Sequence, residues 1–457
     1  MRELETAGYE AYYVGGCVRD FVLSGMGLSP AKAGDIDVTT DATPEEMLDV
    51  FRDYRLIETG LKHGTMTVLT ADGMPVEITT YRTDGDYSDH RHPDSVAFVR
   101  NLEEDLKRRD FTINAMAMDR SGNLRDPFGG TADIEKRVIR AVGDPDRRFD
   151  EDALRIMRAL RFAAVLGDGA HGGNVQFTID QTTEEAMFRK KGLLRNVSSE
   201  RIYAEFKKLI TGHHGGDVVR KYVDILGVVI PQLLPMKGFD QRNPYHKYDI
   251  LEHCVRAMEV VRALDPEDAS KVEYMKMAAL FHDIGKPDTF FIGEDGIGHM
   301  YGHPARGEEI VREIMADMKA DRFTTEKVAL LVKYHDLVFQ NDRKLLKKWM
   351  NKYGAELLLE ILHIKRADNI ATGNMSGELA DKFDAVEQTI AEIVESSECF
   401  SIKDLAIDGR DVTAAIKEGP EVGMILQQIL EEVIDGSLEN DRDELLARMR
   451  ELVKSLP

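Results

Sequence analysis

The spacing of hydrophobic positions changes once along the chain, near residue 149. Up to about Asp144, short β-branched runs alternate with turns, as in DIDVTT, TMTVLT and PVEITTYR, and such runs predict strands. From about Phe149 onward, Leu, Ile and Met recur at helical spacing, as in DALRIMRALRFAAVL, which predicts amphipathic helices. The pattern predicts a multidomain α+β protein, in which a small mixed sheet with helices is followed by an all-helical remainder.

The chain is too long for one ordinary core, because single cores stop growing beyond about 250–300 residues and this chain has 457. Polar and Gly-containing stretches interrupt the helical pattern in several places. We therefore predict a head that contains the sheet, a helical neck, a second helical domain, and a helical C-terminal body and tail. Their expected ranges are 1–144, 145–240, 241–375 and 376–457.

Composition places the chain among water-soluble globular proteins, with 43% hydrophobic and 31% charged residues. No run approaches the roughly 20 apolar residues of a membrane span, and the start lacks a basic segment followed by an apolar one. We therefore expect a cytoplasmic protein. Its cysteines, Cys17, Cys254 and Cys399, are few and widely spaced, which argues against a disulfide framework and against a cysteine-based zinc site.

The formal charge of −22 argues against indiscriminate coating of nucleic acid, because affinity for phosphate backbones comes largely from Lys and Arg. Any contact with RNA must be local. Basic clusters occur at 189–191, 207–208 and 344–348, and each is more typical of a solvated helix face than of an RNA contact.

A Gly-Gly turn follows the first predicted strand, in YYVGGCVRD. Gly15 and Gly16 permit a tight turn that brings backbone amides close to a ligand before a helix begins. A phosphate fits such a place. A plain turn explains the same residues.

Three acids lie on predicted strands of the head. Asp35 and Asp37 alternate in GDIDVTT, so their side chains share one face of a strand. Two adjacent carboxylates repel each other unless a cation lies between them, which favours Mg²⁺; a solvated strand face is the alternative. Glu77, on a later predicted strand, completes the set if sheet pairing brings it beside the other two. Three acids around two metals suit an in-line displacement at phosphorus.

Six segments in succession carry a resemblance: YYVGGCVRD, GDIDVTT, VEITTYRTDGDYSDHRHP, DLKRRDFTINAMA, DPFGGTADI and FDEDALRIMRALRFAA. They are similar to bacterial class II CCA-adding enzymes and poly(A) polymerases, which belong to the polymerase-β-like nucleotidyltransferases. The resemblance implies that the head is the catalytic nucleotidyltransferase domain. Its implied sites are metal binding by Asp35 and Asp37, triphosphate contacts by Gly16 and Arg19, a nucleotide contact by Arg109, and support of the sugar and fold by Asp110 and Asn114. Arg82 to Pro93 resembles the flexible loop required for adding the final A.

A possible base-reading pair follows in FDEDALRIMRALRF. Asp152 and Arg155 are three residues apart, which predicts neighbours on one face of a helix. An aspartate accepts from an exocyclic amine and an arginine donates to a ring acceptor, so the pair suits cytosine and adenine and rejects uracil and guanine. An ordinary surface ion pair is the alternative. The resemblance implies a protein template, with Arg158 and Arg161 reaching phosphates.

A series of histidines and aspartates lies in the second helical domain and resembles the HD phosphohydrolases. Imidazole and carboxylate together suit divalent transition metals. The resemblance implies a metal-dependent hydrolase of 2′,3′-cyclic phosphates or phosphomonoesters. The implied core ligands are His253, His282, Asp283 and Asp368, and His303 and His335 match the additional histidines of dinuclear members.

The resulting expectation is addition of CCA to the 3′ end of tRNA from CTP and ATP, with Mg²⁺ in the head and a divalent transition metal in the HD domain. One alternative is an enzyme that adds A alone or synthesises poly(A), because the head motifs are shared. Another is an HD phosphohydrolase whose head only binds RNA; the intact Asp35, Asp37 and Arg109 speak against it. The sequence makes no prediction about oligomeric state.

Overall fold

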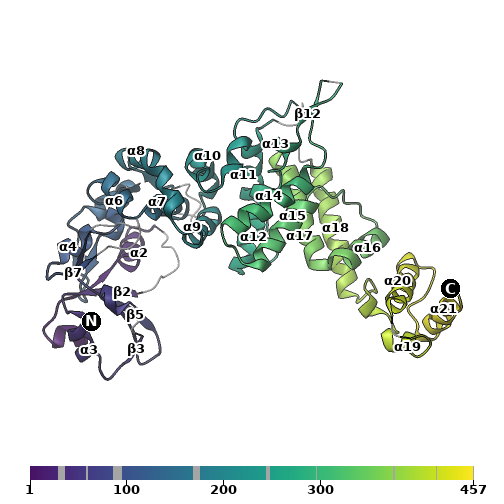
Figure 1. Cartoon of the computed structure of the whole chain (residues 1–457), viewed down its shortest axis with the longest axis horizontal. Helices are drawn as coiled ribbons and strands as arrows, with labels where there is room; N and C mark the ends of the chain where they lie inside the picture. Colours follow the sequence, from purple (N-terminus) through teal and green to yellow (C-terminus); the bar gives the residue numbers. More distant parts are fainter. Residues whose placement is uncertain are drawn as a thin grey trace. The chain divides into compact units, whose positions relative to one another are not determined.

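The computed structural model describes residues 1–28, 36–57, 60–85, 95–167, 175–242, 247–294, 296–373, 376–417 and 419–455. They form two compact units, Met1–Lys237 with Ile314–Asp321, and Gly238–Glu313 with Arg322–Pro457. Strands concentrate in the first part of the chain and helices predominate in the rest (Figure 1), which confirms the predicted α+β class. Among the described residues, no helix combines the length and apolar composition that a membrane crossing requires. The division into four domains stays a prediction.

The head contains one mixed sheet in the order β3-β4-β5-β2-β1-β8-β9. β2 and β5 are parallel, and every other neighbouring pair is antiparallel. Most neighbouring strands of this sheet are also consecutive along the chain. The exceptions are the pair β5 and β2 and the pair β1 and β8. The strands are β1 (Ala11–Val14), β2 (Ile36–Thr40), β3 (Arg55–Ile57), β4 (Thr65–Leu69), β5 (Pro75–Thr80), β8 (Ala117–Met118) and β9 (Leu124–Arg125). A separate antiparallel pair is formed by β6 (Arg82–Asp84) and β7 (Val96–Phe98).

The alternation of side chains along β2 and β5 gives the sheet one apolar face and one face that carries acidic side chains. Val38 and Ile78 are buried in a core with Met47, which lies on α3 (Pro44–Val50). Asp37 and Glu77, one position earlier on each strand, therefore project from the opposite face. Helices α2 (Gly16–Gly25) and α4 (Leu102–Lys107) contribute to the same unit, as do α1 (Arg2–Thr6) and α5 (Gly130–Lys136).

The rest of the first unit is helical around α7 (Leu154–Val165), which packs against α9 (Ser199–Thr211) and α10 (Gly215–Leu226). Ser198 is the N-cap of α9, although its side chain makes no capping hydrogen bond. Two further helices are α6 (Pro145–Glu151) and α8 (Gln181–Lys190), and β10 (Val138–Ile139) pairs with β11 (Thr178–Ile179).

The second unit is built mainly from helices, with one hairpin that the sequence analysis did not predict. The hairpin, β12 (Phe291–Ile292) with β13 (Gly298–His299), interrupts the helical series. The helices are α11 (Ile250–Val260), α12 (Ala269–Phe281), α13 (Lys286–Thr289), α14 (His303–Asp317), α15 (Arg322–Tyr334), α16 (Arg343–Tyr353), α17 (Ala355–Ala371), α18 (Gly377–Glu395), α19 (Gly409–Thr413), α20 (Pro420–Asp435) and α21 (Arg442–Lys454). The last three share a core that includes Ile429, Leu430 and Leu445.

Short 3₁₀ turns occur in both units. They lie at Leu61–His63, Thr112–Asn114, Lys191–Asn196, Pro231–Met236 and Ile402–Asp404.

Candidate functional site

Two carboxylates lie side by side on neighbouring strands of the head. The parallel pairing of β2 and β5 places Asp37 opposite Glu77, and residues paired in this way project from the same face of a sheet. Asp37 is half-buried and Glu77 is exposed. The register brings together two of the three predicted acids, while Asp35 lies outside the described residues.

The predicted Gly-Gly turn lies directly beside Asp37. Val14, the last residue of β1, is paired with Asp37, and Gly15 follows with a φ of 73°, a conformation that favours glycine. A Cβ on Gly15 would lie 3.2 Å from Nη1 of Arg109 and 3.4 Å from Oδ2 of Asp37. The turn, the carboxylate and the guanidinium therefore converge on one place, and a side chain at position 15 would crowd it.

Arg109 offers unused hydrogen-bonding capacity at this place. Its Nη2 lies 3.5 Å from Oδ2 of Asp105, and its buried Nε has no hydrogen-bond partner among the described residues. Burial lowers the pKa of the Arg109 guanidinium, and Asp105 opposes that shift. Because a buried donor without a partner is costly, the group is suited to receive an anionic ligand such as a phosphate.

A chain of hydrogen bonds links the remaining predicted residues of the head. Arg19 Nη1 donates to Oδ1 of Asn114 over 2.9 Å, and Asn114 Nδ2 donates to Oδ1 of Asp110 over 3.0 Å. Asp110 also accepts from Nε of Arg158 over 2.8 Å. Burial alone would raise the pKa of Asp110, but Arg158 and Asn114 hold it well below its ordinary value. The ionised Asp110 thus fixes Asn114 and Arg158 in place.

Three guanidinium groups surround the ring of Phe162. Their central carbons lie 3.9 Å (Arg161), 5.1 Å (Arg19) and 5.5 Å (Arg158) from the ring centroid. Glu205, which the sequence analysis did not single out, pairs with Arg161 Nε at 2.6 Å and with Arg158 Nη1 at 3.7 Å. Each of the three guanidinium groups around the ring is therefore paired with a carboxylate, that of Asp20, Asp110 or Glu205.

The prediction that Asp152 and Arg155 share one helical face is wrong, because the helix breaks between α6 and α7. Asp152 has extended backbone angles, φ −146° and ψ 103°, and its Oδ1 accepts from the backbone N–H of Leu154 over 3.1 Å. A carboxylate that accepts a backbone N–H from the first turn of the next helix favours such a break.

Both side chains of this pair already have partners. Asp152 Oδ2 accepts from Nη2 of Arg201 over 2.7 Å. Arg155 is buried, and its Nη1 donates to Oε2 of Glu151 over 2.7 Å while its Nη2 donates to the carbonyl of Arg108 over 3.0 Å. A carboxylate has about four lone-pair positions and a guanidinium five N–H donors, so both groups retain capacity for a ligand.

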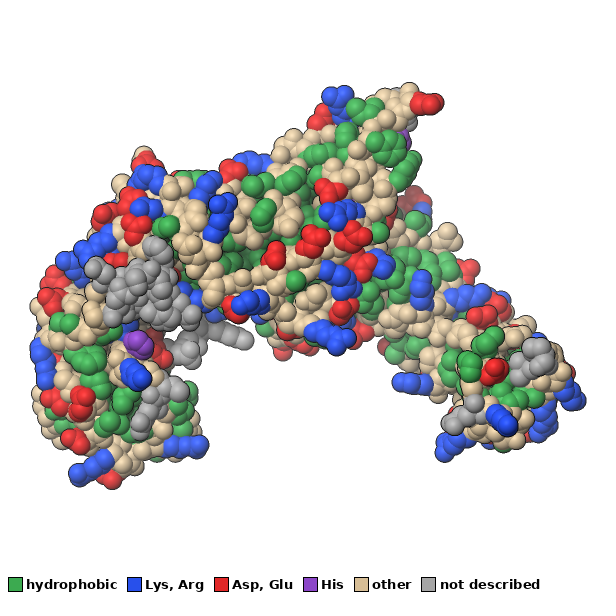
Figure 2. Space-filling model, viewed as in Figure 1, with side chains coloured by type: hydrophobic (Ala, Val, Ile, Leu, Met, Phe, Trp, Pro, Cys, Tyr) green, Lys and Arg blue, Asp and Glu red, His purple; other side chains and the backbone are tan. Residues whose placement is uncertain are grey.

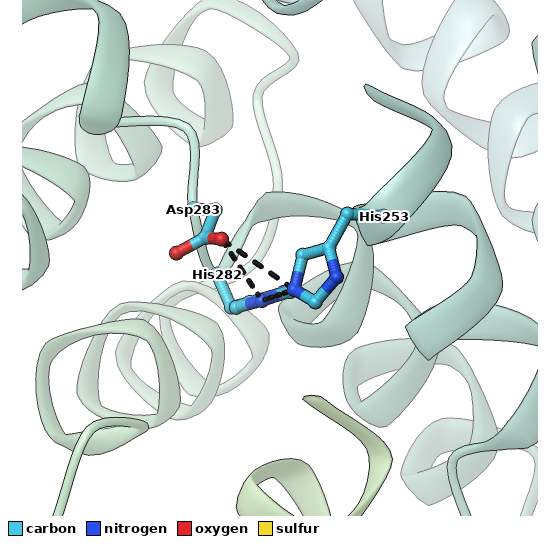
Figure 3. Close-up of side chains that lie close together, drawn as sticks. All are labelled: His253, His282 and Asp283. Atoms are coloured by element: carbon cyan, nitrogen blue, oxygen red, sulfur yellow. Dashed lines mark hydrogen bonds and ion pairs between the residues drawn. The ribbon is translucent and has the colours of Figure 1, made fainter. Parts of the chain in front are cut away.

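Four predicted ligands of the second unit meet around a buried point, three of them drawn in Figure 3. The Nε2 atoms of His253 and His282 lie 3.1 Å apart, and each lies 3.5 Å from Oδ2 of Asp283. Oδ1 of Asp368 lies 3.1 Å from His253 Nε2 and 3.8 Å from His282 Nε2. Helices α11 and α17 and the end of α12 bring these residues together.

The other two predicted ligands meet on the opposite oxygen of the same aspartate. Oδ1 of Asp283 lies 3.3 Å from Nε2 of His303 and 3.6 Å from Nε2 of His335, and these two nitrogens lie 3.2 Å apart. Asp283 therefore belongs to two clusters that could each hold a metal ion. All six predicted ligands are brought together.

The backbone fixes the tautomers of three histidines in this cluster. Nδ1 lies within hydrogen-bonding distance of a carbonyl three residues earlier in His282 (2.8 Å), His303 (2.9 Å) and His335 (2.7 Å). An Nδ1–H that donates to a carbonyl leaves Nε2 with its lone pair, and Nε2 is the atom that faces the cluster. Burial lowers the pKa of His282 to about 3, so this ring is neutral at neutral pH.

Two lysines, which the sequence analysis did not single out, border the carboxylates. Lys286 Nζ lies 2.6 Å from Oδ2 of Asp283, and Lys365 Nζ lies 3.1 Å from Oδ2 of Asp368. Burial alone raises the pKa of a carboxyl group, but Lys286 and His282 hold the pKa of Asp283 well below its ordinary value. Spacings of three residues, 283 to 286 and 365 to 368, are the sequence signal that identifies both lysines.

Three family models match separate parts of the chain. Residues 11–140 match the poly A polymerase head domain, and residues 176–234 match the probable RNA and SrmB-binding site of polymerase A. Residues 305–449 match the putative tRNA nucleotidyltransferase domain 2. The first match contains the acids, the Gly-Gly turn and Arg109.

Similar proteins extend the match over nearly the whole chain. A CCA-adding enzyme of Lactobacillus helveticus is 34% identical over 458 residues, which cover 99% of this chain and 96% of the relative. One of Geobacillus thermodenitrificans is 50% identical over 212 residues, covering 46% of this chain and 48% of the relative. The crystal structure of the Bacillus stearothermophilus CCA-adding enzyme with CTP aligns with a TM-score of 0.71 at 28% identity, over 99% of this chain and 96% of that one. This protein belongs to the family of bacterial CCA-adding enzymes.

Proposed function

We propose that the head adds C, C and A in order to the 3′ end of tRNA, using CTP and ATP. The observation that carries the proposal is the convergence of Asp37, Glu77, the Gly15 turn and Arg109 on one face of the sheet. Carboxylates beside an anion-binding turn suit a reaction that needs divalent cations and a triphosphate at the same place.

The residues of the head divide the chemistry of transfer between them. Asp35 and Asp37, with Glu77, would hold Mg²⁺, which lowers the charge at the triphosphate and assists attack by the tRNA hydroxyl. The 3′ oxygen forms a bond to the α-phosphorus, the bond to the β-phosphate oxygen breaks, and pyrophosphate leaves. Gly15, Gly16, Arg19 and Arg109 orient the triphosphate, while Asp110 and Asn114 hold Arg19 and Arg158 in position.

Base selection is assigned to Asp152 and Arg155, with Arg158 and Arg161 facing phosphates. An Asp152→Ala variant should lose roughly ten- to hundredfold in preference for CTP over UTP, because a correctly paired base edge is worth about 1–3 kcal/mol. The measurement is kcat/KM for each nucleotide. Asp150→Ala is the matched control, since Asp150 is an exposed residue of α6 that pairs with Lys190; equal loss of preference in both variants contradicts the assignment.

The experiment that tests the function uses tRNA lacking its terminal triplet. Purified protein is incubated with each labelled nucleoside triphosphate separately and then with pairs of them. The proposal predicts two C residues followed by one A. Incorporation of A alone, or of long A tails, would instead establish the A-adding or poly(A)-synthesising alternative.

We further propose that the His/Asp cluster is a metal-dependent phosphohydrolase that acts on 2′,3′-cyclic phosphates or phosphomonoesters. Six ligands of imidazole and carboxylate type, with Nε2 atoms aimed inward, fit divalent transition metals. Such metals lower the pKa of water and neutralise phosphate charge. His253, His282, Asp283 and Asp368 would hold one ion, and the other oxygen of Asp283, with His303 and His335, a second.

Gly285 provides a test of this metal site that does not alter a ligand. A Cβ there would lie 2.3 Å from the carbonyl oxygen of His303 and 2.6 Å from the backbone nitrogen of Gly307, so Gly285→Ala must displace the start of α14. We expect the variant to retain about tenfold less metal after dialysis, measured by elemental analysis. Gly377→Ala, which meets no atom within 4 Å, is the control. Equal metal content in both variants would contradict the assigned ligands.

A further inference from the structure

Three aromatic side chains gather on one face of the β12–β13 hairpin. Phe291 is paired with His299 across the strands, and Tyr301 follows His299 by two residues, so all three share a face. The His299 and Tyr301 rings are stacked, with centroids 5.3 Å apart and planes at 22°. Phe291 lies 5.5 Å from His299 and 5.7 Å from Tyr301. We call these three residues the aromatic platform.

The aromatic platform is exposed although it is mostly hydrophobic. Phe291 is 45% exposed and Tyr301 is 73% exposed. Figure 1 shows the hairpin protruding from the helices of its unit, and Figure 2 shows hydrophobic side chains at the surface of this projection. Exposed aromatic surface of this kind marks interaction sites.

The hairpin lies between two of the proposed metal ligands in the chain. Asp283 precedes it, and His303 follows it at the start of α14. Only Gly302 separates Tyr301 from His303, so their Cα atoms are at most roughly 7 Å apart. Nδ1 of His303 lies 2.9 Å from the carbonyl oxygen of Met300, the residue before Tyr301. The aromatic platform is thus attached directly to the rim of the cluster.

The base of the hairpin is anchored, which holds the aromatic platform in place. The backbone N–H of Gly298 donates to the carbonyl of Arg242 over 2.9 Å. A Cβ on Gly298 would lie 2.1 Å from the carbonyl oxygen of Gln241, so the two segments are in close contact. Gln241 also accepts from Nζ of Lys286 over 3.3 Å, and Lys286 contacts Asp283.

We propose that the aromatic platform stacks against the terminal base of a single-stranded RNA end whose phosphate is hydrolysed at the His/Asp cluster. The proposal rests on the phosphohydrolase proposed above and names its substrate class. Stacked, exposed rings favour a flat aromatic partner, and the adjacent cluster selects a phosphate. A nucleotide carries both groups on one molecule. An unpaired end is required, because a base within a duplex is covered on both faces by its neighbours.

Hydrolysis of this substrate needs water as its only other reactant. With a 2′,3′-cyclic phosphate, an oxygen of water forms a bond to phosphorus and the bond from phosphorus to one ribose oxygen breaks. That ribose oxygen takes up a proton as water loses one. The product is a phosphomonoester, and the base remains unchanged throughout.

The test compares two substrates that share the five-membered phosphate ring. Adenosine 2′,3′-cyclic phosphate has a base, and glycerol 1,2-cyclic phosphate has none. In the unaltered protein with its metal bound, we expect kcat/KM to be higher for the adenosine substrate. Tyr301→Ala should lower the ratio of the two kcat/KM values about tenfold or more, mainly through KM, because stacking contributes about 1–3 kcal/mol per base. Tyr301→Phe should keep most of the ratio, since it keeps the ring.

Ile292→Ala is the matched control. Ile292 is 50% exposed on the same hairpin but belongs to the other face, so its loss should leave the ratio within about twofold. An unchanged ratio in Tyr301→Ala, or equal ratios in both alanine variants, would refute the aromatic platform and leave the phosphohydrolase standing. A change of oligomeric state in Tyr301→Ala, seen by light scattering, would show a protein contact and also refute it. If the unaltered protein hydrolyses neither substrate, both proposals fail.

Discussion

Asp37→Asn should lower the rate of nucleotide addition by roughly a thousandfold or more. The substitution keeps the size of the side chain and removes the charge that the proposed cations require. Charge stabilisation by metal ions contributes several kcal/mol, and each 1.36 kcal/mol changes a rate about tenfold. Glu77→Gln should have a smaller effect, because Glu77 is exposed whereas Asp37 is half-buried. The measurement is single-turnover incorporation of labelled CMP into tRNA that lacks its triplet.

Asp53→Asn is the control for this prediction. Asp53 is an exposed acid of the head whose ion pair with Arg52 spans 3.7 Å, and such surface pairs contribute little to stability. It should transfer nucleotides at the unaltered rate. Thermal unfolding of all variants checks that the head remains folded. If the folded Asp37→Asn variant retains more than about a tenth of the unaltered rate of CMP incorporation, Asp37 is not required for nucleotide transfer.

His282→Ala is expected to abolish phosphohydrolysis and to leave nucleotide addition intact. His282 is fully buried, and its Nε2 faces both His253 and Asp283. Changes in the outer shell of metal sites cost about 10–100-fold in activity, and loss of a ligand should cost at least as much. Activity is measured with a 2′,3′-cyclic phosphate, and metal content by elemental analysis.

The control for this variant is His213→Ala, because His213 is an exposed histidine outside the His/Asp cluster. It should retain both activities and the metal. Loss of nucleotide addition in a folded His282→Ala protein would mean that the two sites are not separate. Full hydrolysis without bound metal would exclude the cluster as the hydrolytic site.

The sequence singled out three acids of the head, but their proximity depends on the sheet. Alternation along β2 was enough to orient Asp37 away from the core residue Val38. That Glu77 lies beside Asp37 follows from the parallel pairing of β2 with β5, and two other strands separate these in sequence. Local patterns do not specify such long-range register.

The break between α6 and α7 shows a different limit. A continuous helical pattern through residues 149–162 led to one predicted helix. The structure ends α6 at Glu151, and the Asp152 carboxylate accepts from the backbone N–H of Leu154, the first residue of α7. An aspartate just before an apolar run is a recognised signal for a helix start. Asp152 is such a signal, but the helical spacing of the apolar residues around it favoured one continuous helix.

The His/Asp cluster was predicted almost completely, because its ligand types and their order resemble a known superfamily. Only the structure shows that the two carboxylate oxygens of Asp283 face different halves of the cluster. The hairpin was missed because strands of two residues give almost no periodicity. Gly296 and Gly298, in GEDGIGHMYGH, are the turn signals that mark it.

A crystal structure with CTP and Mg²⁺ tests the central assignment most directly. We expect the triphosphate beside Gly15 and Arg109, with metal density against Asp37. We also expect the amine of cytosine at Asp152 and a ring acceptor at Arg155. A nucleotide bound with its phosphates away from Asp37, or with its base edge away from Asp152 and Arg155, would contradict it.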